Sequence, residues 1–364
     1  MTTSIAFFIY SLDNGGAERV TSILANEMIT QNVLVTLVTM KPITEQSYHV
    51  DPKIQIISLS DRNKIEKNSS GILFNLKRIW GLRRLVRENN IDVLITMMTS
   101  ANIVGILATL MMRTKCIISE RIHPGESSSG RFWFFLRKHL YGKAHCVIVQ
   151  SESGANWLRE NTSSTNVEVI PNPLEMPMRN VEPFVPVIRT DSKLLMAAGR
   201  LTYQKQFHQL IEVFSQLPPY LDDWKLIIVG DGKERDSLQE QIKSLGQPNR
   251  IILAGRVGNI SDWYRRASLF VMTSAYEGYP NALIEAMAHG LPVVSYNCKS
   301  GPSEVINNNV NGLLVDVNDT VELEKSLELL MSDSKKAEEF GRNAENIVDM
   351  LSPTAVTNTW VRLF

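Results

Sequence analysis

The chain has 364 residues, enough for two domains of ordinary size at about 150 residues each. Its 44% hydrophobic and 21% charged residues allow a large buried core, which excludes a disordered protein. Basic and acidic residues both number 38, and this balance argues against a dedicated nucleic-acid-binding protein, which would carry a basic surplus.

Short apolar segments alternate with amphipathic stretches through the first 170 residues. Continuous apolarity is typical of parallel strands that helices cover on both faces. The expected strands are Ser4–Tyr10, Val33–Met40, Ile54–Leu59, Asp92–Met97, Lys115–Ser119, His145–Val149 and Val167–Ile170. The alternation stops at residues 171–192, which contain five prolines and no hydrophobic period, so we expect a linker there.

The alternation of strands and helices restarts after this linker. The expected strands are Lys193–Ala198, Lys225–Val229, Ile251–Leu253, Leu269–Met272, Pro292–Tyr296 and Gly312–Val315. From Thr320 to Phe364 the pattern is helical, and Ser352-Pro353 is a typical helix start. The sequence therefore predicts two doubly wound α/β domains with a ligand in the cleft between them.

Gly15 and Gly16 stand between the first expected strand and a helical segment. Glycines there let a ligand approach the backbone, and the helix N-terminus favours an anion; a tight turn explains them equally well. The segment lacks the dinucleotide fingerprint G-x-G-x-x-G, and the chain has no P-loop. These absences argue against an NAD-dependent dehydrogenase and against most nucleotide hydrolases.

Arg200 and Lys205 follow the first expected strand of the second half, which ends at Gly199. At the carboxyl end of such a strand they face the ligand cleft. A planar arginine fork and a lysine point charge together suit a diphosphate. Two solvated loop cations are the alternative.

The segment SAYEGYPNALIEAMAHGLPVV, residues 274–294, is the most informative in the chain. Glu277 lies in a loop after a strand, and Glu285 lies one turn into a helix, among small apolar residues. A buried carboxylate is costly unless it accepts hydrogen bonds, and sugar hydroxyls are natural donors. The N-terminus of this helix also favours a phosphate. An exposed glutamate on an ordinary amphipathic helix is the alternative.

Together these segments resemble the retaining glycosyltransferases of the GT-B fold, in the large family 4 group. The matching pieces are Gly15-Gly16-Ala17-Glu18-Arg19, Gly199-Arg200-Leu201 with Lys205, Gly230-Asp231-Gly232, Glu277 with Glu285, and Gly301-Pro302-Ser303-Glu304. The resemblance implies two Rossmann-like domains. The first, 1–172, binds the acceptor and includes a crossing helix at 352–364; a linker, 173–192, leads to the nucleotide-sugar-binding domain, 193–351.

The resemblance also implies a role for each matching residue. Arg200 and Lys205 bind and stabilise the leaving diphosphate and Glu277 contacts the transferred sugar, so these three are the catalytic candidates. Glu285 holds the nucleotide ribose, and Arg256-Val257 lies against the base. The remaining donor contacts are Gly15, Gly16, Gly278, Tyr279, Asn281, Ala282 and Leu283. Such enzymes use a nucleotide sugar as co-substrate, so we expect no bound metal and no further cofactor.

One loop departs from the common family pattern. Many relatives place a histidine after the fifth strand of the first domain, where this sequence has Arg121. The Ser119-Glu120-Arg121 form is similar to many bacterial surface-polysaccharide transferases. We expect Glu120, Arg121 and His123 on the acceptor and sugar side, with a structural role for His123 as the alternative.

Residues 71–143 carry 12 basic and 4 acidic side chains, concentrated on two helical segments. In the second, RFWFFLRKHLYGK, aromatic rings beside cations are typical of a helix on anionic lipid. The expected membrane contacts are Arg131, Phe132, Trp133, Phe134, Phe135, Arg137 and Lys138. For the first, GILFNLKRIWGLRRLVREN, a lipid-facing helix and a sheet-packing helix with a solvated basic back are equally good interpretations.

A membrane-surface transferase implies a lipid-linked acceptor. The chain is similar to enzymes that extend a sugar on polyprenyl diphosphate in O-antigen, lipopolysaccharide or capsule synthesis. We expect transfer of a hexose or N-acetylhexosamine, with a UDP-HexNAc donor such as UDP-GalNAc. The alternatives are a nucleotide-sugar 2-epimerase on the same fold and a non-catalytic two-lobed sugar-binding protein.

The expected location is cytoplasmic, at the inner face of the plasma membrane. The first residues lack a basic segment ahead of their short apolar run, so we expect no secretion signal. No stretch of 18 apolar residues occurs that would span a bilayer. The three cysteines lack disulfide or metal spacing, which favours a reduced compartment.

Overall fold

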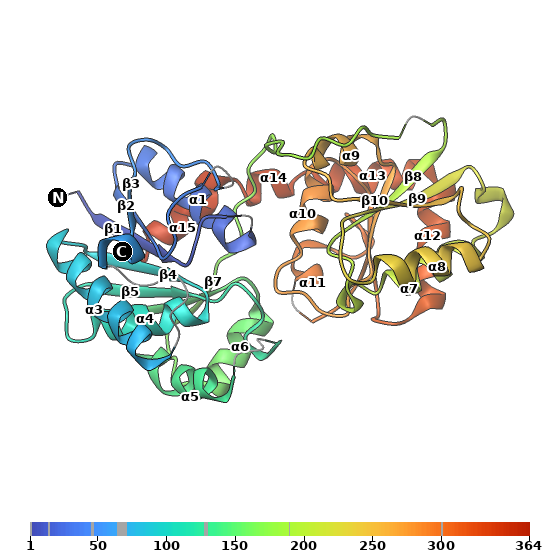
Figure 1. Cartoon of the computed structure of the whole chain (residues 1–364). Helices are drawn as coiled ribbons and strands as arrows, with labels where there is room; N and C mark the ends of the chain where they lie inside the picture. The colour runs from blue at the N-terminus through green and yellow to red at the C-terminus, as the bar shows by residue number, and fades with distance from the viewer. Residues whose placement is uncertain are drawn as a thin grey trace. The chain divides into compact units, whose positions relative to one another are not determined.

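The structure is a computed structural model, and it describes residues 2–13, 15–44, 47–63, 71–126, 130–188, 190–299 and 301–364. The chain divides into two compact units (Figure 1). The first comprises Met1–Glu175 with Leu351–Phe364, and the second comprises Met176–Met350. The segment 173–192, expected as a linker, is thus shared between the two units.

The first unit contains a seven-stranded parallel sheet in the order β3-β2-β1-β4-β5-β6-β7. Its strands are β1 (Ser4–Ile9), β2 (Leu34–Thr39), β3 (Gln55–Ser58), β4 (Val93–Met97), β5 (Lys115–Ser119), β6 (Cys146–Val149) and β7 (Val167–Val169). Each lies within a strand that the sequence predicts. The apolar runs are continuous because neighbouring residues bury on opposite faces: Phe8 belongs to one core cluster, and Phe7 and Ile9 belong to the other.

Helices cover both faces of this sheet. They are α1 (Gly16–Thr30), α2 (Leu59–Asn63), α3 (Ile72–Glu88), α4 (Thr99–Thr109), α5 (Arg131–Leu140), α6 (Glu152–Asn161) and α15 (Pro353–Val361). Ser352 begins α15, as the sequence predicts, because its side chain accepts a hydrogen bond from the amide of Ala355. Helix α15 packs on α1, where Thr354 donates to Glu27 at 2.7 Å.

The second unit contains six parallel strands in the order β10-β9-β8-β11-β12-β13. They are β8 (Lys193–Ala198), β9 (Trp224–Val229), β10 (Ile251–Gly255), β11 (Leu269–Met272), β12 (Val293–Tyr296) and β13 (Leu313–Val315). The helices are α7 (Phe207–Gln216), α8 (Arg235–Ser244), α9 (Ile260–Arg266), α10 (Asn281–Ala288), α11 (Pro302–Val305), α12 (Thr320–Ser332), α13 (Ser334–Ala344) and α14 (Ile347–Met350).

Both sheets reverse their strand order beside the first strand of the unit. In the first unit the reversal lies between β1 and β4, and in the second between β8 and β11. Loops that leave two such neighbouring strands at their carboxyl ends run to opposite faces of the sheet, which opens a crevice for a ligand. This confirms the predicted fold class of two doubly wound domains. None of the described helices is long and apolar enough to cross a membrane.

All three cysteines are buried in these cores, and burial raises the pKa of each of Cys116, Cys146 and Cys298 to about 12. The thiolate is the reactive form, so the native protein should leave a thiol reagent such as DTNB unreacted at pH 8. The same protein unfolded in urea should titrate all three thiols. Rapid labelling of any cysteine before unfolding would contradict the burial described here.

Candidate functional site

The strand reversal of the second unit brings two loops together. Residues 199–206 follow β8, and residues 273–280 follow β11. The amide of Ala275 donates to the carbonyl of Gln204 at 2.8 Å, and the Gln204 side chain donates to the carbonyl of Tyr276 at 2.7 Å. The hydroxyl of Thr273 donates to the carbonyl of Lys205 at 2.9 Å. These three bonds hold the two loops as one surface.

Lys205 and Glu277 form an ion pair across these loops, 72 residues apart in sequence. The Lys205 Nζ contacts Glu277 Oε1, and both side chains are mostly buried. A β-carbon on Gly199 would lie 2.9 Å from Lys205 Cε, so the glycine makes room for the lysine stem over the end of β8. Two of the three residues predicted to be catalytic are therefore in direct contact.

The Gly-Asp-Gly segment at 230–232 supports the loop that carries Arg200. A β-carbon on Gly230 would lie 1.9 Å from the carbonyl oxygen of Gly199, and one on Gly232 would lie 2.3 Å from that of Leu201. Gly230 also has a φ of +138°, which disfavours any side chain. The sequence shows this segment only as a family match, and the structure gives its reason: close backbone packing under Arg200.

Arg200 and Arg256 are exposed cations at this edge. Arg200 follows β8 and Arg256 follows β10, so both stand at the carboxyl ends of strands in one sheet. Within the described part of the chain, neither guanidinium forms a hydrogen bond or an ion pair. Both are thus available to an anionic ligand. Val257, beside Arg256, is half-buried.

Glu285 is buried in α10, as its small apolar neighbours predict. The hydroxyl of Tyr264, on α9, lies 3.2 Å from Glu285 Oε2 and 3.2 Å from the carbonyl of Ala282. His289 Nδ1 lies 2.7 Å from the Glu285 carbonyl oxygen, and its Nε2 lies 2.7 Å from Ser261 Oγ. The protein therefore supplies a hydrogen-bond donor to this carboxylate itself. No pattern in the sequence points to Tyr264.

The start of α10 rests on the segment after β12. A β-carbon on Gly301, whose φ is +112°, would lie 2.5 Å from Pro280 Cδ, so this glycine packs directly against the helix start. The other predicted donor contacts of this segment differ in burial. Tyr279 and Leu283 are buried, Gly278 and Ala282 are half-buried, and Asn281 is exposed.

In the first unit, Gly15 precedes α1 and Gly16 is its first residue. A β-carbon on Gly15 would lie 2.0 Å from Glu18 Oε2, so the Glu18 side chain folds over this glycine. Burial raises the pKa of Glu18. The local fold thus accounts for Gly15, and the contact of Gly15 and Gly16 with a donor stays a prediction.

Glu120 is buried among protein groups, whereas we expected it on the acceptor and sugar side. It follows β5 and is fully enclosed: Tyr141 donates to its Oε1, and Thr99 donates to its Oε2 at 2.9 Å. Arg137 lies 3.9 Å from the same carboxylate. Burial raises the pKa of Glu120. A charged residue in a loop is usually exposed to solvent. Glu120 can be buried because three other segments of the chain supply polar partners for its carboxylate.

His123 has both ring nitrogens engaged inside the protein, which favours the structural role that the sequence left as the alternative. It is buried; its Nδ1 accepts from the amide of Gly125 at 3.2 Å, and its Nε2 lies 3.3 Å from Ser153 Oγ. Arg121 is half-buried and donates to the side chain of Asn172. Of the three residues predicted for the acceptor side, Arg121 is the one that keeps partial exposure.

The exposed apolar residues at this edge were missed by the sequence reasoning. Tyr10 follows β1, Met98 follows β4 and Ile122 lies three residues after β5, and all three are exposed. Met98 also has a φ of +79°, a strained conformation for a residue with a side chain. Single apolar residues after strands give no signal in the sequence, because strand ends are apolar anyway.

Helix α5 presents only part of its predicted membrane face. Phe132 and Phe135 are 63% and 58% exposed, and Phe134 and Lys138 are also exposed. Trp133, by contrast, is half-buried and packs on the core. The Arg131 side chain lies outside what the structure describes.

Arg137 contradicts the prediction of a membrane contact, because it is only 2% exposed. Its guanidinium donates to the carbonyl of Pro124 at 2.9 Å and lies 4.8 Å from the ring centre of Trp157. Trp133 and Arg137 are four residues apart, so they share the inward face of the helix.

Helix α3 has an outward face that is both apolar and basic. Leu73 and Trp80 are 76% and 69% exposed, and Leu76 is exposed between them. These positions follow the helical repeat, and Lys77, Arg84 and Arg87 continue the same face. The back of this helix is thus not simply a solvated basic surface. Helices α3, α4 and α5 pack side by side in one layer (Figure 1).

Comparison with known families covers almost the whole chain. Residues 14–176 match the family described as Glycosyltransferase Family 4, and residues 178–347 match the family described as Glycosyl transferases group 1. An uncharacterized glycosyltransferase of Methanocaldococcus jannaschii is 31% identical over 279 residues, which cover 68% of this chain and 67% of that protein.

Two further relatives carry more specific names. The amylovoran biosynthesis glycosyltransferase AmsD of Erwinia amylovora is 29% identical over 96% of this chain and 95% of its own. A Campylobacter jejuni protein is 28% identical over 99% of this chain and 97% of its own. Its name describes an α-1,4-N-acetyl-D-galactosaminyltransferase acting on a GalNAc-containing undecaprenol diphosphate.

Solved structures of the same fold match nearly every residue. A glycosyltransferase from Rickettsia africae has a TM-score of 0.81 at 18% identity, covering 100% of this chain and 97% of its own. Anabaena HepE in complex with UDP-glucose has a TM-score of 0.74 at 20% identity, covering 99% and 98%. At this level of identity the likeness shows the fold.

Replacing Gly230 with alanine tests the backbone packing under Arg200. The added carbon would meet the Gly199 carbonyl at 1.9 Å, so we expect a loss in unfolding free energy of about 2–4 kcal/mol from strain and overpacking. Gly246→Ala is the matched control, because Gly246 also has a positive φ but nothing lies within 4 Å of its added carbon. We expect the control to cost about 1 kcal/mol in urea titrations, and equal losses would refute the role of close packing.

Proposed function

The chain belongs to the GT-B glycosyltransferases that combine a family 4 domain with a group 1 domain, and we propose that it extends a lipid-linked sugar in surface-polysaccharide synthesis. The transferred group is a hexose or N-acetylhexosamine, moved with retention of configuration at its anomeric carbon. The observation that carries the proposal is the ion pair of Lys205 with Glu277 across two bonded loops at the strand reversal, one of which also carries Arg200.

These residues suit the departure of a nucleoside diphosphate. The bond between the anomeric carbon and the diphosphate oxygen breaks, and negative charge develops on the leaving group. Arg200, unpaired among the described residues, and Lys205 would neutralise that charge, and fixed cations do so without reorganising solvent. In this proposal two side chains supply the positive charge, so the reaction needs no divalent metal and no cofactor besides the nucleotide sugar.

In this proposal Glu277 and Glu285 bind the two parts of the donor on either side of the diphosphate, the transferred sugar and the nucleoside. Glu277, which contacts the Lys205 ammonium group, would accept hydrogen bonds from the sugar next to the diphosphate. Glu285, fixed by Tyr264, takes the ribose hydroxyls, while Arg256 and Val257 lie against the base. We infer a UDP-HexNAc donor such as UDP-GalNAc. The Campylobacter relative is named for N-acetylgalactosamine transfer, and the Anabaena structure contains UDP-glucose, which supports this donor class.

The acceptor side of the proposal rests on the first unit. Tyr10, Met98 and Ile122 expose apolar surface at the carboxyl edge of its sheet, which suits the apolar face of a sugar ring. Arg121 stands beside them. The acceptor class, a polyprenyl-diphosphate-linked sugar, agrees with the undecaprenol-linked substrate in the name of the Campylobacter relative.

A lipid-linked acceptor requires the enzyme to work at a membrane surface. The outward rings of α5 and the outward face of α3 combine apolar side chains with lysine and arginine, as helices on anionic lipid do. We infer peripheral association with the cytoplasmic face of the plasma membrane. In this arrangement the protein rests on the bilayer while its active site reaches the lipid-linked sugar.

The donor site is tested by Lys205→Ala. Loss of a cation that stabilises the leaving group should lower kcat/KM about a hundredfold or more. The control is Lys335→Ala at an exposed position of α13, which should leave the rate unchanged. The assay offers UDP-sugars and GDP-sugars with a synthetic polyprenyl-diphosphate sugar in EDTA and follows products by mass spectrometry. Near-normal turnover by Lys205→Ala refutes the site, and epimerised nucleotide sugar without transfer establishes the epimerase instead.

The membrane contact of α5 is tested by the double variant Phe132→Ser/Phe135→Ser. Each exposed ring that enters the bilayer interface contributes about tenfold in affinity, so vesicle binding should fall about a hundredfold. Phe184→Ser is the control, because that ring is similarly exposed on the second unit. Binding is measured by cosedimentation with anionic vesicles, and unchanged binding of the double variant would show that α5 is not the anchor.

A further inference from the structure

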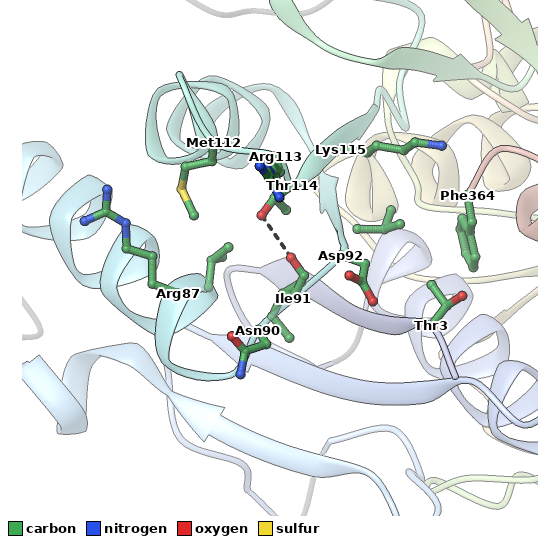
Figure 2. A pocket seen from close by; sticks show the side chains of 12 residues that line it. Thr3, Arg87, Asn90, Ile91, Asp92, Met112, Arg113, Thr114, Lys115 and Phe364 are labelled. Carbon is green, nitrogen blue, oxygen red and sulfur yellow. Dashed lines mark hydrogen bonds between the residues drawn. The ribbon is translucent and has the colours of Figure 1, made fainter. Parts of the chain in front are cut away.

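A hollow of about 560 Å³ lies at the amino edge of the first-unit sheet (Figure 2). Its walls come from the residues around the starts of β1, β4 and β5, from the end of α3, from the turn after α4 and from Phe364. The loops that carry Gly15 and Arg121 leave the opposite, carboxyl edge of the same sheet. The hollow is therefore separate from the transfer site.

The lining of this hollow is positive. Arg87 lines it from the end of α3, and Arg113 and Lys115 line it from the stretch that enters β5; none of their charged groups has a hydrogen bond or ion pair within the described ranges. Asp92 is the one acidic side chain of the lining, and it already accepts a hydrogen bond from the amide of Ser4 at 2.9 Å. Phe364, at the end of the described chain, adds its main-chain carboxylate to the lining. Three basic side chains thus face two carboxyl groups, and this surplus of positive charge favours an anionic ligand.

One wall of the hollow is a turn that holds apolar side chains out in solvent. Met111 is 95% exposed with a φ of +61°, and Leu110 before it is also exposed. The guanidinium of Arg83, on α3, fixes this turn by donating to the carbonyl of Ala108 at 2.9 Å and to that of Leu110 at 2.8 Å. The backbone of this turn is strained, and Arg83 fixes it in a conformation that exposes a methionine. Such fixed strain is typical of functional positions and favours a role for Met111.

The same turn continues directly into the hollow. Met112 and Arg113 line it, and Arg87 belongs to α3, the helix that also exposes Trp80 and Leu76. Apolar side chains therefore border a cluster of unpaired cations. Cations beside exposed apolar side chains suit a membrane interface, where phosphate headgroups meet acyl chains. A binding site for a free anion in solution would need no apolar side chains beside it.

We propose that this hollow binds the phosphate of an anionic phospholipid headgroup, while Leu110 and Met111 enter the adjacent apolar layer. The inference deepens the proposed function, because it rests on the proposed work at a membrane surface. It adds a second, chemically selective contact to the aromatic contact of α5. The apolar walls from Ile91 and Met112 suit the glycerol part of the lipid.

The test compares Arg113→Ala/Lys115→Ala with Lys243→Ala/Lys335→Ala, which removes the same charge from exposed positions of the second unit. Vesicles contain phosphatidylcholine alone or with about 30% phosphatidylglycerol. The first variant should lose about tenfold or more of its affinity for the anionic vesicles and keep its binding to phosphatidylcholine. Equal losses of vesicle affinity in the two double variants would overturn the site, because they would show that the vesicles respond only to the overall positive charge of the protein.

Soluble probes separate the possible sources of the phosphate. Dihexanoyl-phosphatidylglycerol, used below its micelle concentration, should bind the wild-type protein in calorimetry and fail to bind Arg113→Ala/Lys115→Ala. Inorganic phosphate should bind at least tenfold more weakly than the lipid. If inorganic phosphate binds as well as the lipid does, the hollow is a free-anion site and the lipid assignment is wrong.

A further variant and the transferase assay separate this proposal from the proposed function. Met111→Ser should weaken vesicle binding without changing the affinity for the soluble lipid. All of these variants should keep wild-type transfer to a detergent-dispersed acceptor, because the hollow is remote from the transfer site. If the wild-type protein binds the soluble lipid but does not bind vesicles, the proposed work at a membrane surface is wrong and the lipid site in the hollow stands. If the wild-type protein binds vesicles but does not bind the soluble lipid, the lipid site in the hollow is wrong and the proposed function is unaffected.

Discussion

The donor-side architecture depends on the reversal of strand order between β8 and β11. Because these strands are neighbours whose following helices belong to opposite halves of the sheet, the two loops begin side by side and then separate. One backbone hydrogen bond and two bonds from side chains to the backbone join the loops, and the glycines at 230 and 232 let a third segment pack closely against the loop after β8. Lys205 and Glu277 can then form an ion pair with little freedom left to lose on binding a ligand.

Much of this arrangement follows from the sequence, for a physical reason. Strands buried on both faces need continuous apolar runs, so their positions and their carboxyl ends can be predicted. Lys205 and Glu277 each follow such a run, and parallel strands of one sheet end at the same edge, so their proximity is predictable as well. The family motifs then add the roles that spacing alone leaves open.

Two of the failures share one cause, which is that polar residues can be buried when distant segments supply their partners. Glu120 lies in a loop but is enclosed by Tyr141, Thr99 and Arg137, none of them near it in sequence. Tyr264 beside Glu285 is hidden in the same way. Helix α5 failed differently: its rings cover the whole circumference, so composition could not show which side faces inward.

Arg137 gives α5 a consequence beyond its exposed rings. The outer side of this helix carries Phe132 and Phe135. On its inner side the Arg137 guanidinium donates a hydrogen bond to the carbonyl of Pro124 and lies near the carboxylate of Glu120. A ten-residue helix moves as a rigid rod, so its two sides cannot be displaced independently. Any displacement of α5 at its outer rings would therefore also displace Arg137 from Pro124 and Glu120, which belong to the loop that carries Arg121.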